Sequence, residues 1–217
     1  MNPSKSTDKV RSFVLSLKDQ QGNPLWVLHP DPKVDVSIFP INEVYLRQNG
    51  LQSMFIASDT NAVDLEKMKS LGFGAGDGVY VLGFPMGLAG AERNYVITRK
   101  GSIARITDYI GGDQPTFLID ALIFPGNSGG PVFCALEAMA ITGTQGHHDV
   151  LLIGVVRAYL PYTEVAVSQQ TQQPRVLFEE NSGLADVVPV DRINETVQAY
   201  IKLHPVDLQP KIQTLKP

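Results

Sequence analysis

The sequence predicts an all-β fold of antiparallel strands, arranged as a sandwich or a barrel. Most apolar segments are short, rich in β-branched residues and bounded by turn residues, which is typical of strands. They recur at hairpin spacing with Gly, Pro or Asn between them, which favours antiparallel pairing over a parallel sheet. The chain has 217 residues, 43% of them hydrophobic, and is therefore long enough to bury a sizeable core.

Eight segments fit this strand pattern. They are residues 12–17, 25–28, 34–40, 78–84, 95–106, 116–119, 131–134 and 151–158. Two further segments indicate helices, since 63–71 ends at a glycine typical of a C-terminal cap and 192–203 follows shortly after a proline. The QQTQQP tract at 169–174 predicts a surface loop, and the proline-containing end at 204–217 predicts a tail.

Charge and composition exclude several classes of partner. A net charge of -4 and a pI near 5.5 show no basic excess of the kind that binding to a phosphate backbone requires, so nucleic acid is not expected. No stretch reaches the length of a membrane helix, and the opening MNPSKSTDKV lacks the apolar core of a signal peptide. The lone Cys134 excludes an internal disulfide. As written, the chain is expected to be cytoplasmic, with no membrane partner.

The run FPGNSGGPVF at 124–133 places one serine among glycines. Because glycine loses the most backbone entropy on folding, such a run indicates that the backbone itself is needed here. A serine becomes a nucleophile when a base takes its proton and hydrogen-bond donors stabilise the oxyanion formed on the substrate. Gly126 permits a tight turn that aims the amides of Gly126 and Ser128 at one point. The run therefore predicts a nucleophilic serine beside an oxyanion hole, with a glycine-rich β-turn lacking any chemistry as the alternative.

GNSGG also matches the G-x-S-x-G elbow of α/β-hydrolases. That elbow needs a helix directly after the serine, and partners in the order Ser, acid, His. His204 with Asp186 or Asp191 would satisfy the order. However, the helix would begin with Gly-Gly-Pro, and the alternation of strands and helices that forms a parallel sheet is missing. An esterase of this class is the less favoured alternative.

Four segments of the sequence are similar to segments of a known protein family and follow one another in the same order as they do there. DALIFPGNSGGPVF (120–133) contains the serine turn, KVDVSIFPI (33–41) contains Asp35, and GDGVYVLGFPMG (76–87) and NSGLADVVPVDRI (181–193) are strand segments. They resemble the nucleophile segment, the aspartate segment, the strand entering the second barrel, and the closing strand with its helix in trypsin-like serine peptidases. The resemblance is to the bacterial branch that includes the HtrA proteins, without a PDZ-like region.

The resemblance implies a fold of two antiparallel β-barrels and an activity of serine endopeptidase type. The implied organisation is a peptidase domain at 1–203, with a partial first barrel at about 12–75, a second barrel at 76–190 and a C-terminal helix at 191–203, followed by a tail at 204–217. Peptide bonds of a protein or peptide substrate would be hydrolysed through an acyl-enzyme, and no metal or organic cofactor would be required.

The resemblance also assigns the catalytic roles. Ser128 would be the nucleophile, Asp35 the acid that orients a histidine, and the amides of Gly126 and Ser128 the oxyanion hole. Since a buried acid fixes the tautomer of its histidine, apolar surroundings from Val34, Val36 and Ile38 are expected around Asp35. The alternative for Asp35 is a surface carboxylate at the end of a strand.

Substrate-binding residues follow from the same resemblance. Arg157, Ala158 and Tyr159 would lie nearest the substrate on the wall that pairs with its backbone, and Ile123 would lie near the specificity pocket. No acidic floor is evident in that pocket, which predicts a preference for apolar residues over basic ones at the cleaved position. Asn127 cannot form the ion pair by which an acid at this place receives a cleaved amino terminus, so activation by that route is not expected.

The family's histidine is missing from its expected place. In the order His, Asp, Ser it should precede Asp35 by several tens of residues, yet His29 is the only histidine before Asp35. His29 lies in a proline-flanked HPDP turn, and we expect it to be a solvent-exposed loop residue. His147 and His148 are expected in a solvated turn, poorly placed to chelate a metal because neighbouring strand side chains point to opposite faces. His204 begins the tail.

Two functions remain open from the sequence. In the first, Met1 is an internal start, and an upstream segment supplies the histidine and the first strands, without which a six-stranded first barrel cannot close. In the second, the chain is complete and is a peptidase-like module that binds peptides without cleaving them. The intact GNSGG favours the first. In either case the chain as written is expected to show negligible peptidase activity, and its oligomeric state is not predicted.

Overall fold

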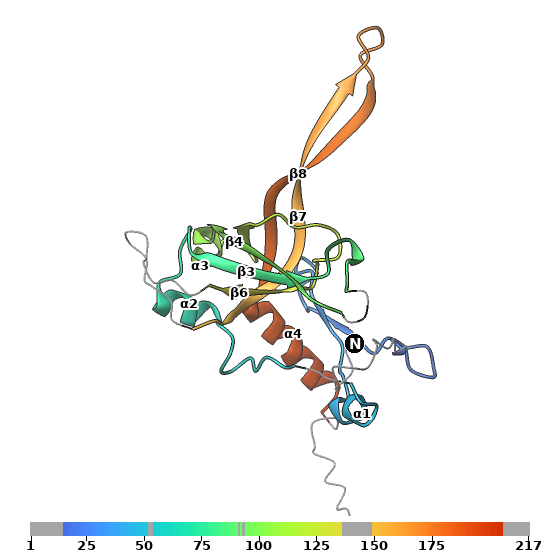
Figure 1. Ribbon diagram of the computed structural model, residues 1–217, viewed down its shortest axis with the longest axis vertical. Coiled ribbons are helices and arrows are strands. Elements are labelled where there is room, and N and C mark those ends of the chain that lie inside the picture. Colours follow the sequence, from blue (N-terminus) through green and yellow to red (C-terminus); the bar gives the residue numbers. More distant parts are fainter. Residues whose placement is uncertain (1–14, 52–53, 91, 93, 136–148, 206–217) are drawn as a thin grey trace, which may run out of the picture.

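The centre of the molecule is a closed barrel of six antiparallel strands (Figure 1). The computed structural model describes residues 15–51, 54–90, 92, 94–135 and 149–205. Around the barrel the strands follow the order β3-β4-β5-β8-β7-β6. Their bounds are β3 Gly78–Gly83, β4 Ile97–Arg105, β5 Phe117–Asp120, β6 Pro131–Cys134, β7 Leu152–Val167 and β8 Pro174–Pro189. The prediction of a mostly β, antiparallel fold is confirmed.

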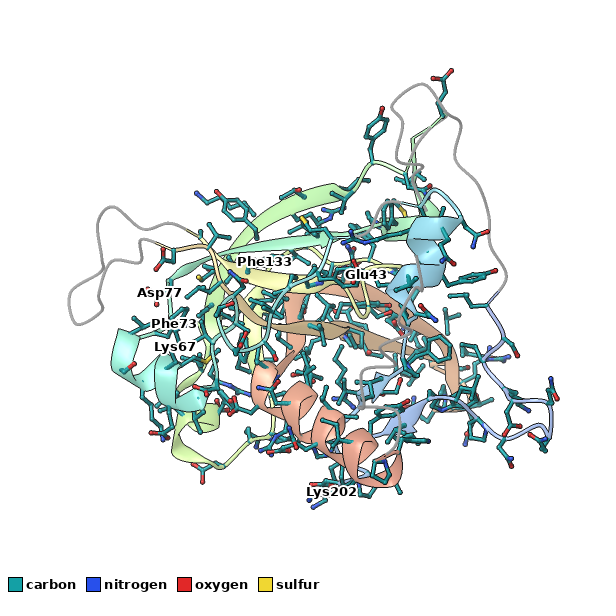
Figure 2. All side chains as sticks on the ribbon, turned by 90° about the horizontal axis from the view of Figure 1, so that it is seen from below. Glu43, Lys67, Phe73, Asp77, Phe133 and Lys202 are labelled. Atoms are coloured by element: carbon teal, nitrogen blue, oxygen red, sulfur yellow. The ribbon has the colours of Figure 1, made fainter. Side chains whose placement is uncertain are left out.

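Side chains alternate between the two faces of each strand, and those that point inward fill the barrel. Val79 and Val81 on β3, Ile119 on β5 and Ile153 on β7 are completely buried. This period of two is the reason why β-branched residues recur at every second position of these strands. The core continues onto helix α2 (Leu65–Leu71) and onto Phe73, which follows this helix (Figure 2). The hydrophobic segments of the sequence therefore form one continuous core.

The region before the barrel forms a much smaller sheet. Strands β1 (Val27–Leu28) and β2 (Ser37–Ile38) pair antiparallel and pack against the C-terminal helix α4 (Val190–Leu203). The strand predicted at 12–17 is not formed at residues 15–17, and residues 12–14 lie outside the described part of the chain. Across the described residues the chain closes one barrel, so the finer prediction of two barrels is not confirmed.

Helices α2 (Leu65–Leu71) and α4 agree with the two predicted helical segments. Asp64 caps the start of α2 by accepting a hydrogen bond from the Lys67 amide at 2.9 Å, and Gly72 ends it with a left-handed φ of 70°. Two short helices, α1 (Glu43–Gln48) and α3 (Thr107–Gly111), and the 3-10 turn η1 (Pro85–Gly87) were not predicted. None of the helices in the described part of the chain has both the length and the apolar composition needed to cross a membrane.

Strands β7 and β8 continue far beyond the barrel as a two-stranded ribbon, the long orange projection in Figure 1. The sequence predicted that the strand beginning at 151 would end at 158, but β7 continues to Val167. The loop predicted at 169–174 forms the turn at the tip of this ribbon, where the Ser168 amide donates to the Gln173 carbonyl at 3.0 Å. The second half of the hairpin, β8, then returns and closes the barrel against β5.

Candidate functional site

The serine turn connects β5 to β6 and depends on glycine at one position. Gly126 has a φ of 95°, a conformation that residues with a side chain rarely adopt. A Cβ placed there would lie 2.5 Å from the Phe84 carbonyl oxygen and 3.1 Å from the Met86 nitrogen. The backbone of the η1 segment therefore packs directly against Gly126, and a larger residue would displace one of the two segments.

Two amides of this turn have no hydrogen-bond partner within the described part of the chain. They belong to Gly126 and Ser128, the pair that the sequence assigned to an oxyanion hole. The side chain of Ser128 is exposed, and its hydroxyl likewise has no partner among the described residues. Amides without a partner in an exposed turn, next to an exposed hydroxyl, are able to bind an anionic or strongly polarised oxygen.

Asn127 fixes the turn from inside the protein. Its side chain is completely buried, and its Oδ1 accepts a hydrogen bond from the Phe124 amide at 3.2 Å. Its own amide donates to the Phe124 carbonyl at 3.0 Å, and its carbonyl accepts from Gly130 at 2.9 Å. The Nδ2 group is buried without a hydrogen-bond partner among the described residues. Sequence reasoning assigned Asn127 only the absence of an ion pair, whereas in the structure it holds the turn closed.

A pocket of about 470 Å³ opens beside Ser128. It is lined by Asp35, Val36, Ser37, Ile38, Ser128, Gly129, Val155, Val156, Arg157 and Ile193. These residues come from the β2 segment, the serine turn, β7 and the start of α4. The structure therefore brings Asp35 and Ser128, which are far apart in the sequence, into one pocket. The hydrogen bond from the Gly129 amide to the Val156 carbonyl, 2.7 Å long, holds the serine turn against β7.

Asp35 is more exposed than the sequence predicted. Its side chain keeps 77% of its accessible surface, so the expected apolar enclosure is wrong. Side chains alternate along the extended β2 segment: Val34 is buried and Val36 half-buried, while Asp35 between them faces solvent and the pocket. Its Oδ2 lies 3.6 Å from Arg157 Nε. Asp35 therefore has an arginine beside it, not a histidine.

Arg157 links the pocket to the barrel wall. Its Nη1 donates to Oδ2 of Asp186, a buried carboxylate on β8, at 2.9 Å. This hydrogen bond raises the pKa of Arg157, so the guanidinium remains charged. The other oxygen of Asp186, Oδ1, is buried without a partner among the described residues. Asp186 therefore depends on Arg157 to balance its charge.

The other predicted substrate residues lie around this pocket and not in it. Ile123 is 2% exposed and packs in the barrel core, while its carbonyl accepts a hydrogen bond from the Asn181 side chain. Ala158 is exposed and follows Arg157 along β7. Tyr159 is half-buried, and its hydroxyl donates to Glu179 at 2.8 Å. Of these four residues predicted to contact substrate, Arg157 is the one that lines the pocket.

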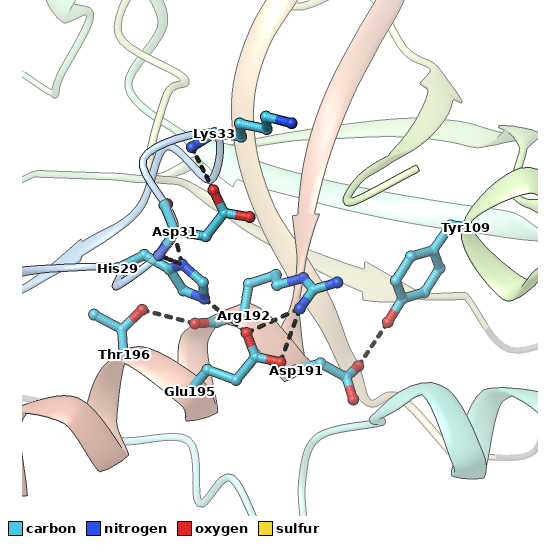
Figure 3. Close-up of polar contacts among 8 residues, drawn as sticks. All are labelled: His29, Asp31, Lys33, Tyr109, Asp191, Arg192, Glu195 and Thr196. Carbon is cyan, nitrogen blue, oxygen red and sulfur yellow. Dashed lines mark hydrogen bonds and ion pairs between the residues drawn. The ribbon is translucent and has the colours of Figure 1, made fainter. Parts of the chain in front are cut away.

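His29 is buried, so the prediction of a solvent-exposed loop histidine is wrong. Helix α4 covers it, and its Nε2 lies 2.7 Å from Oε2 of Glu195 (Figure 3). Its Nδ1 accepts a hydrogen bond from the Asp31 amide at 2.9 Å. Burial alone would raise the pKa of Glu195, but the hydrogen bonds from Arg192 and His29 outweigh this effect and lower it. Both ring nitrogens of His29 are thus engaged, Nε2 by Glu195 of α4 and Nδ1 by Asp31 of its own loop, and His29 does not line the pocket beside Ser128.

Among the described residues, the other histidine also lies away from the lining of this pocket. His204 stacks on the ring of Tyr200 with centroids 4.3 Å apart, at the end of α4. His147 and His148 lie outside the described residues. Over the described part of the chain, no histidine lines the pocket beside Ser128. The same part holds no group of three or more His, Cys, Asp or Glu side chains that could bind a metal ion.

A second polar network joins three helices below the barrel. Asp191 at the start of α4 accepts a hydrogen bond from the hydroxyl of Tyr109 at 2.6 Å (Figure 3), and another from the amide of Leu65 at 2.9 Å. Burial, and then the Asp191 carboxylate, raise the pKa of Tyr109. The sequence indicated no function for Tyr109, because its partner is distant in the chain. Its contacts link α3 and α2 to α4.

Comparison with known proteins leaves this site without an assigned family. No protein-family model matches the chain, and no curated protein matches it.

Proposed function

We propose that this chain carries the nucleophile and the acid of a trypsin-like serine endopeptidase. In this proposal the β3–β8 barrel corresponds to the second barrel of that fold, and the β1–β2 sheet to a part of the first. The observation that carries it is the setting of Ser128: it is exposed, its amide and that of Gly126 have no hydrogen-bond partner among the described residues, and it lines the same pocket as Asp35. The GNSGG turn supports the same chemistry from the sequence.

In the proposed reaction Ser128 Oγ attacks the carbonyl carbon of a peptide bond. The carbonyl oxygen then becomes an oxyanion and accepts hydrogen bonds from the amides of Gly126 and Ser128. Collapse of this intermediate expels the amine and leaves an acyl-enzyme, which water hydrolyses. The apolar side chains of Ile38, Val155 and Ile193 in the pocket lining support the predicted preference for apolar substrate residues.

The reaction needs a base that takes the proton of Ser128. Within the described residues the pocket offers no histidine for this step. We therefore propose that the base is a residue outside the described part of the chain or a group supplied in trans. Asp35 would orient that base after moving away from Arg157, a small change because the two groups are 3.6 Å apart and exposed.

A second function, peptide binding without cleavage, is favoured by one observation. Arg157 lies where it can pair with Asp35, so the carboxylate that would orient a histidine already has a cationic neighbour. A guanidinium stays charged near neutral pH and cannot act as the base. In this alternative the free amides of Gly126 and Ser128 hold a peptide carbonyl, and no bond is broken.

A fluorophosphonate probe with and without added imidazole distinguishes these functions. Imidazole can enter the pocket as a free base, so the peptidase proposal predicts slow labelling that imidazole accelerates. Ser128→Ala should abolish the labelling. Ser37→Ala is the matched control, because Ser37 is an exposed serine of the same pocket, and it should change nothing.

Each other outcome has a defined meaning. Fast labelling without imidazole would show that a base is already present, and His147→Ala and His148→Ala would then test the two histidines outside the described residues. If imidazole has no effect, an acetylated and amidated apolar peptide is titrated into ¹⁵N-labelled protein. Shifts of the Gly126 and Ser128 amide resonances would support the binding module, and the absence of both labelling and shifts would refute both functions.

A further inference from the structure

The ribbon formed by β7 and β8 beyond the barrel, residues 161–181, is here named the arm. Its two strands pair in a regular register from Pro161 opposite Asn181 to Ala166 opposite Val176. In Figure 1 the arm projects away from the rest of the molecule. Nearly all of its residues are exposed. An isolated two-stranded ribbon is marginally stable in water, because it lacks a layer on which to bury its side chains.

The arm nevertheless displays large apolar side chains. Six of them are at least 50% exposed: Tyr162, Val165, Val167, Val176, Leu177 and Phe178. The register divides them between the two faces of the ribbon, with Val165 and Leu177 on one face and Val176 and Phe178 on the other. Exposed apolar side chains on both faces of an uncovered ribbon favour an interaction site. The arm therefore has the character of an interaction surface.

One edge of the arm is open for strand pairing. Strand β8 pairs with β7 along one edge and, within the barrel, with β5 along the other edge, through Leu184–Val187. In the arm, the edge that faces away from β7 has no strand partner among the described residues. Natural proteins protect such edges with lysine, proline or bulges. Between Arg175 and Glu180 the edge of β8 has no lysine or proline, and the ladder with β7 is regular from Val176 to Asn181.

The sequence along this edge is complementary to itself. It reads Arg-Val-Leu-Phe-Glu from Arg175 to Glu179, with opposite charges at its two ends and apolar residues between them. An antiparallel pair of such strands, related by a two-fold axis at Leu177, places Arg175 of each copy opposite Glu179 of the other. It also places Val176 opposite Phe178, and Leu177 opposite its own copy. From Arg175 to Glu179, every cross-strand pair is then either apolar or of opposite charge.

The outer edge of β7 does not have this property. From Tyr162 to Val167 it contains Glu164 and no basic residue, so a symmetric pairing there would form no ion pair. Charge complementarity therefore selects β8 as the edge and a second copy of the chain as its occupant.

We propose that two copies of this chain dimerise through their arms, by antiparallel pairing of β8 with β8 across a two-fold axis at Leu177. The product is a four-stranded sheet, and the two barrels lie at its opposite ends. A closed two-fold dimer uses the same β8 edge on both copies, so no β8 edge remains open to a third copy. This proposal does not depend on the function of Ser128.

Sedimentation velocity of the full chain tests the proposal by charge exchange. The unmodified chain should form dimers whose affinity falls at high salt, since two surface ion pairs contribute. In an R175E dimer, the glutamate at position 175 of each copy would lie opposite Glu179 of the other copy, so two pairs of like charge would form. In an E179R dimer, the arginine at position 179 would lie opposite Arg175 in the same two places. Each variant alone should weaken dimerisation roughly tenfold or more, because two favourable pairs become unfavourable. An equal mixture of the two variants should form heterodimers again, since both pairs then have opposite charges.

Two controls separate this pairing from other effects. E180R replaces a glutamate by an arginine, as E179R does, but at the next position. In the proposed register Glu180 lies opposite Pro174 of the other copy and not opposite a charged residue, so E180R should affect dimerisation far less. Tyr159→Phe removes the hydrogen bond to Glu179 that E179R also removes, and it should leave the dimer intact. A monomeric unmodified chain at high micromolar concentration would overturn the proposal. So would R175E and E179R variants that dimerise normally, or that fail to form heterodimers on mixing.

Discussion

Replacing Gly126 by alanine tests the physical basis of the serine turn. Two costs are expected. A left-handed backbone costs a residue with a side chain about 1–2 kcal/mol. The new Cβ would also lie 2.5 Å from the Phe84 carbonyl oxygen, well inside the 3.4 Å at which ordinary contacts begin. Since that neighbour is backbone, the turn or the η1 segment must move, which costs roughly 1–3 kcal/mol more.

Gly129→Ala is the matched control for this prediction. Gly129 lies in the same turn with a φ of 77°, but a Cβ there meets nothing within 4 Å. It should therefore show the backbone cost alone, about 1–2 kcal/mol. Urea denaturation of both variants measures the difference. An equal loss of stability would refute the reasoning, because it would mean that the contact with Phe84 is absent in solution. In a chain made active by added base, the displaced Gly126 amide should in addition cost about 3 kcal/mol of transition-state stabilisation, measured as a loss of turnover.

Three further changes test the contacts around the site. His29→Ala should lower the free energy of unfolding by roughly 1–3 kcal/mol, because it leaves buried polar partners without a hydrogen bond. The same variant should leave the imidazole-assisted labelling of Ser128 unchanged. Loss of labelling would identify His29 as the base. Tyr109 has a raised pKa in the folded chain, so its contribution to stability is present below pH 10 and is lost as the pH rises above that value, where the unfolded chain ionises first. Tyr109→Phe should therefore weaken the alkaline fall in urea stability, and an unchanged fall would exclude this residue as its cause. Arg157→Gln should lower the free energy of unfolding by roughly 1–3 kcal/mol. This is less than the loss expected when a fully buried ion pair is broken, because the Arg157 side chain is 42% exposed. In a double-mutant cycle, the further change Asp186→Asn should restore most of the lost stability.

The sequence predicts the barrel strands well because burial imposes a period of two on them. Strands β3, β4 and β6 lie within predicted segments, β5 extends one residue beyond the segment predicted at 116–119, and each of the four carries buried β-branched residues. The outer halves of β7 and β8 have no buried face, so the pattern that marks a half-buried strand is missing there. Strands β1 and β2 lie within the predicted segments 25–28 and 34–40, but each is only two residues long, shorter than the segment predicted for it.

The serine turn was predictable for a different reason. Gly126 and Ser128 belong to one local motif, and local backbone geometry can be inferred from neighbouring residues. The surroundings of Asp35 and His29 depend instead on helix α4, which lies far along the chain and packs on the β1–β2 sheet. Apolar neighbours in sequence suggested a buried Asp35, although alternation along a strand places such neighbours on the opposite face. Tertiary packing decided both cases.

Arg157 connects the proposed chemistry to the stability of the barrel. Its ion pair with Asp35 joins two exposed groups at 3.6 Å, whereas its hydrogen bond to Asp186 joins it to a carboxylate that is 8% exposed. An exposed pair contributes little, but an unpaired buried carboxylate is costly, so Asp186 determines where the guanidinium lies. Asp35 can therefore exchange Arg157 for an incoming base with little loss of stability. In the proposed function the guanidinium therefore remains in the pocket, and we expect the partner of Asp35, and not that of Arg157, to decide between cleavage and binding.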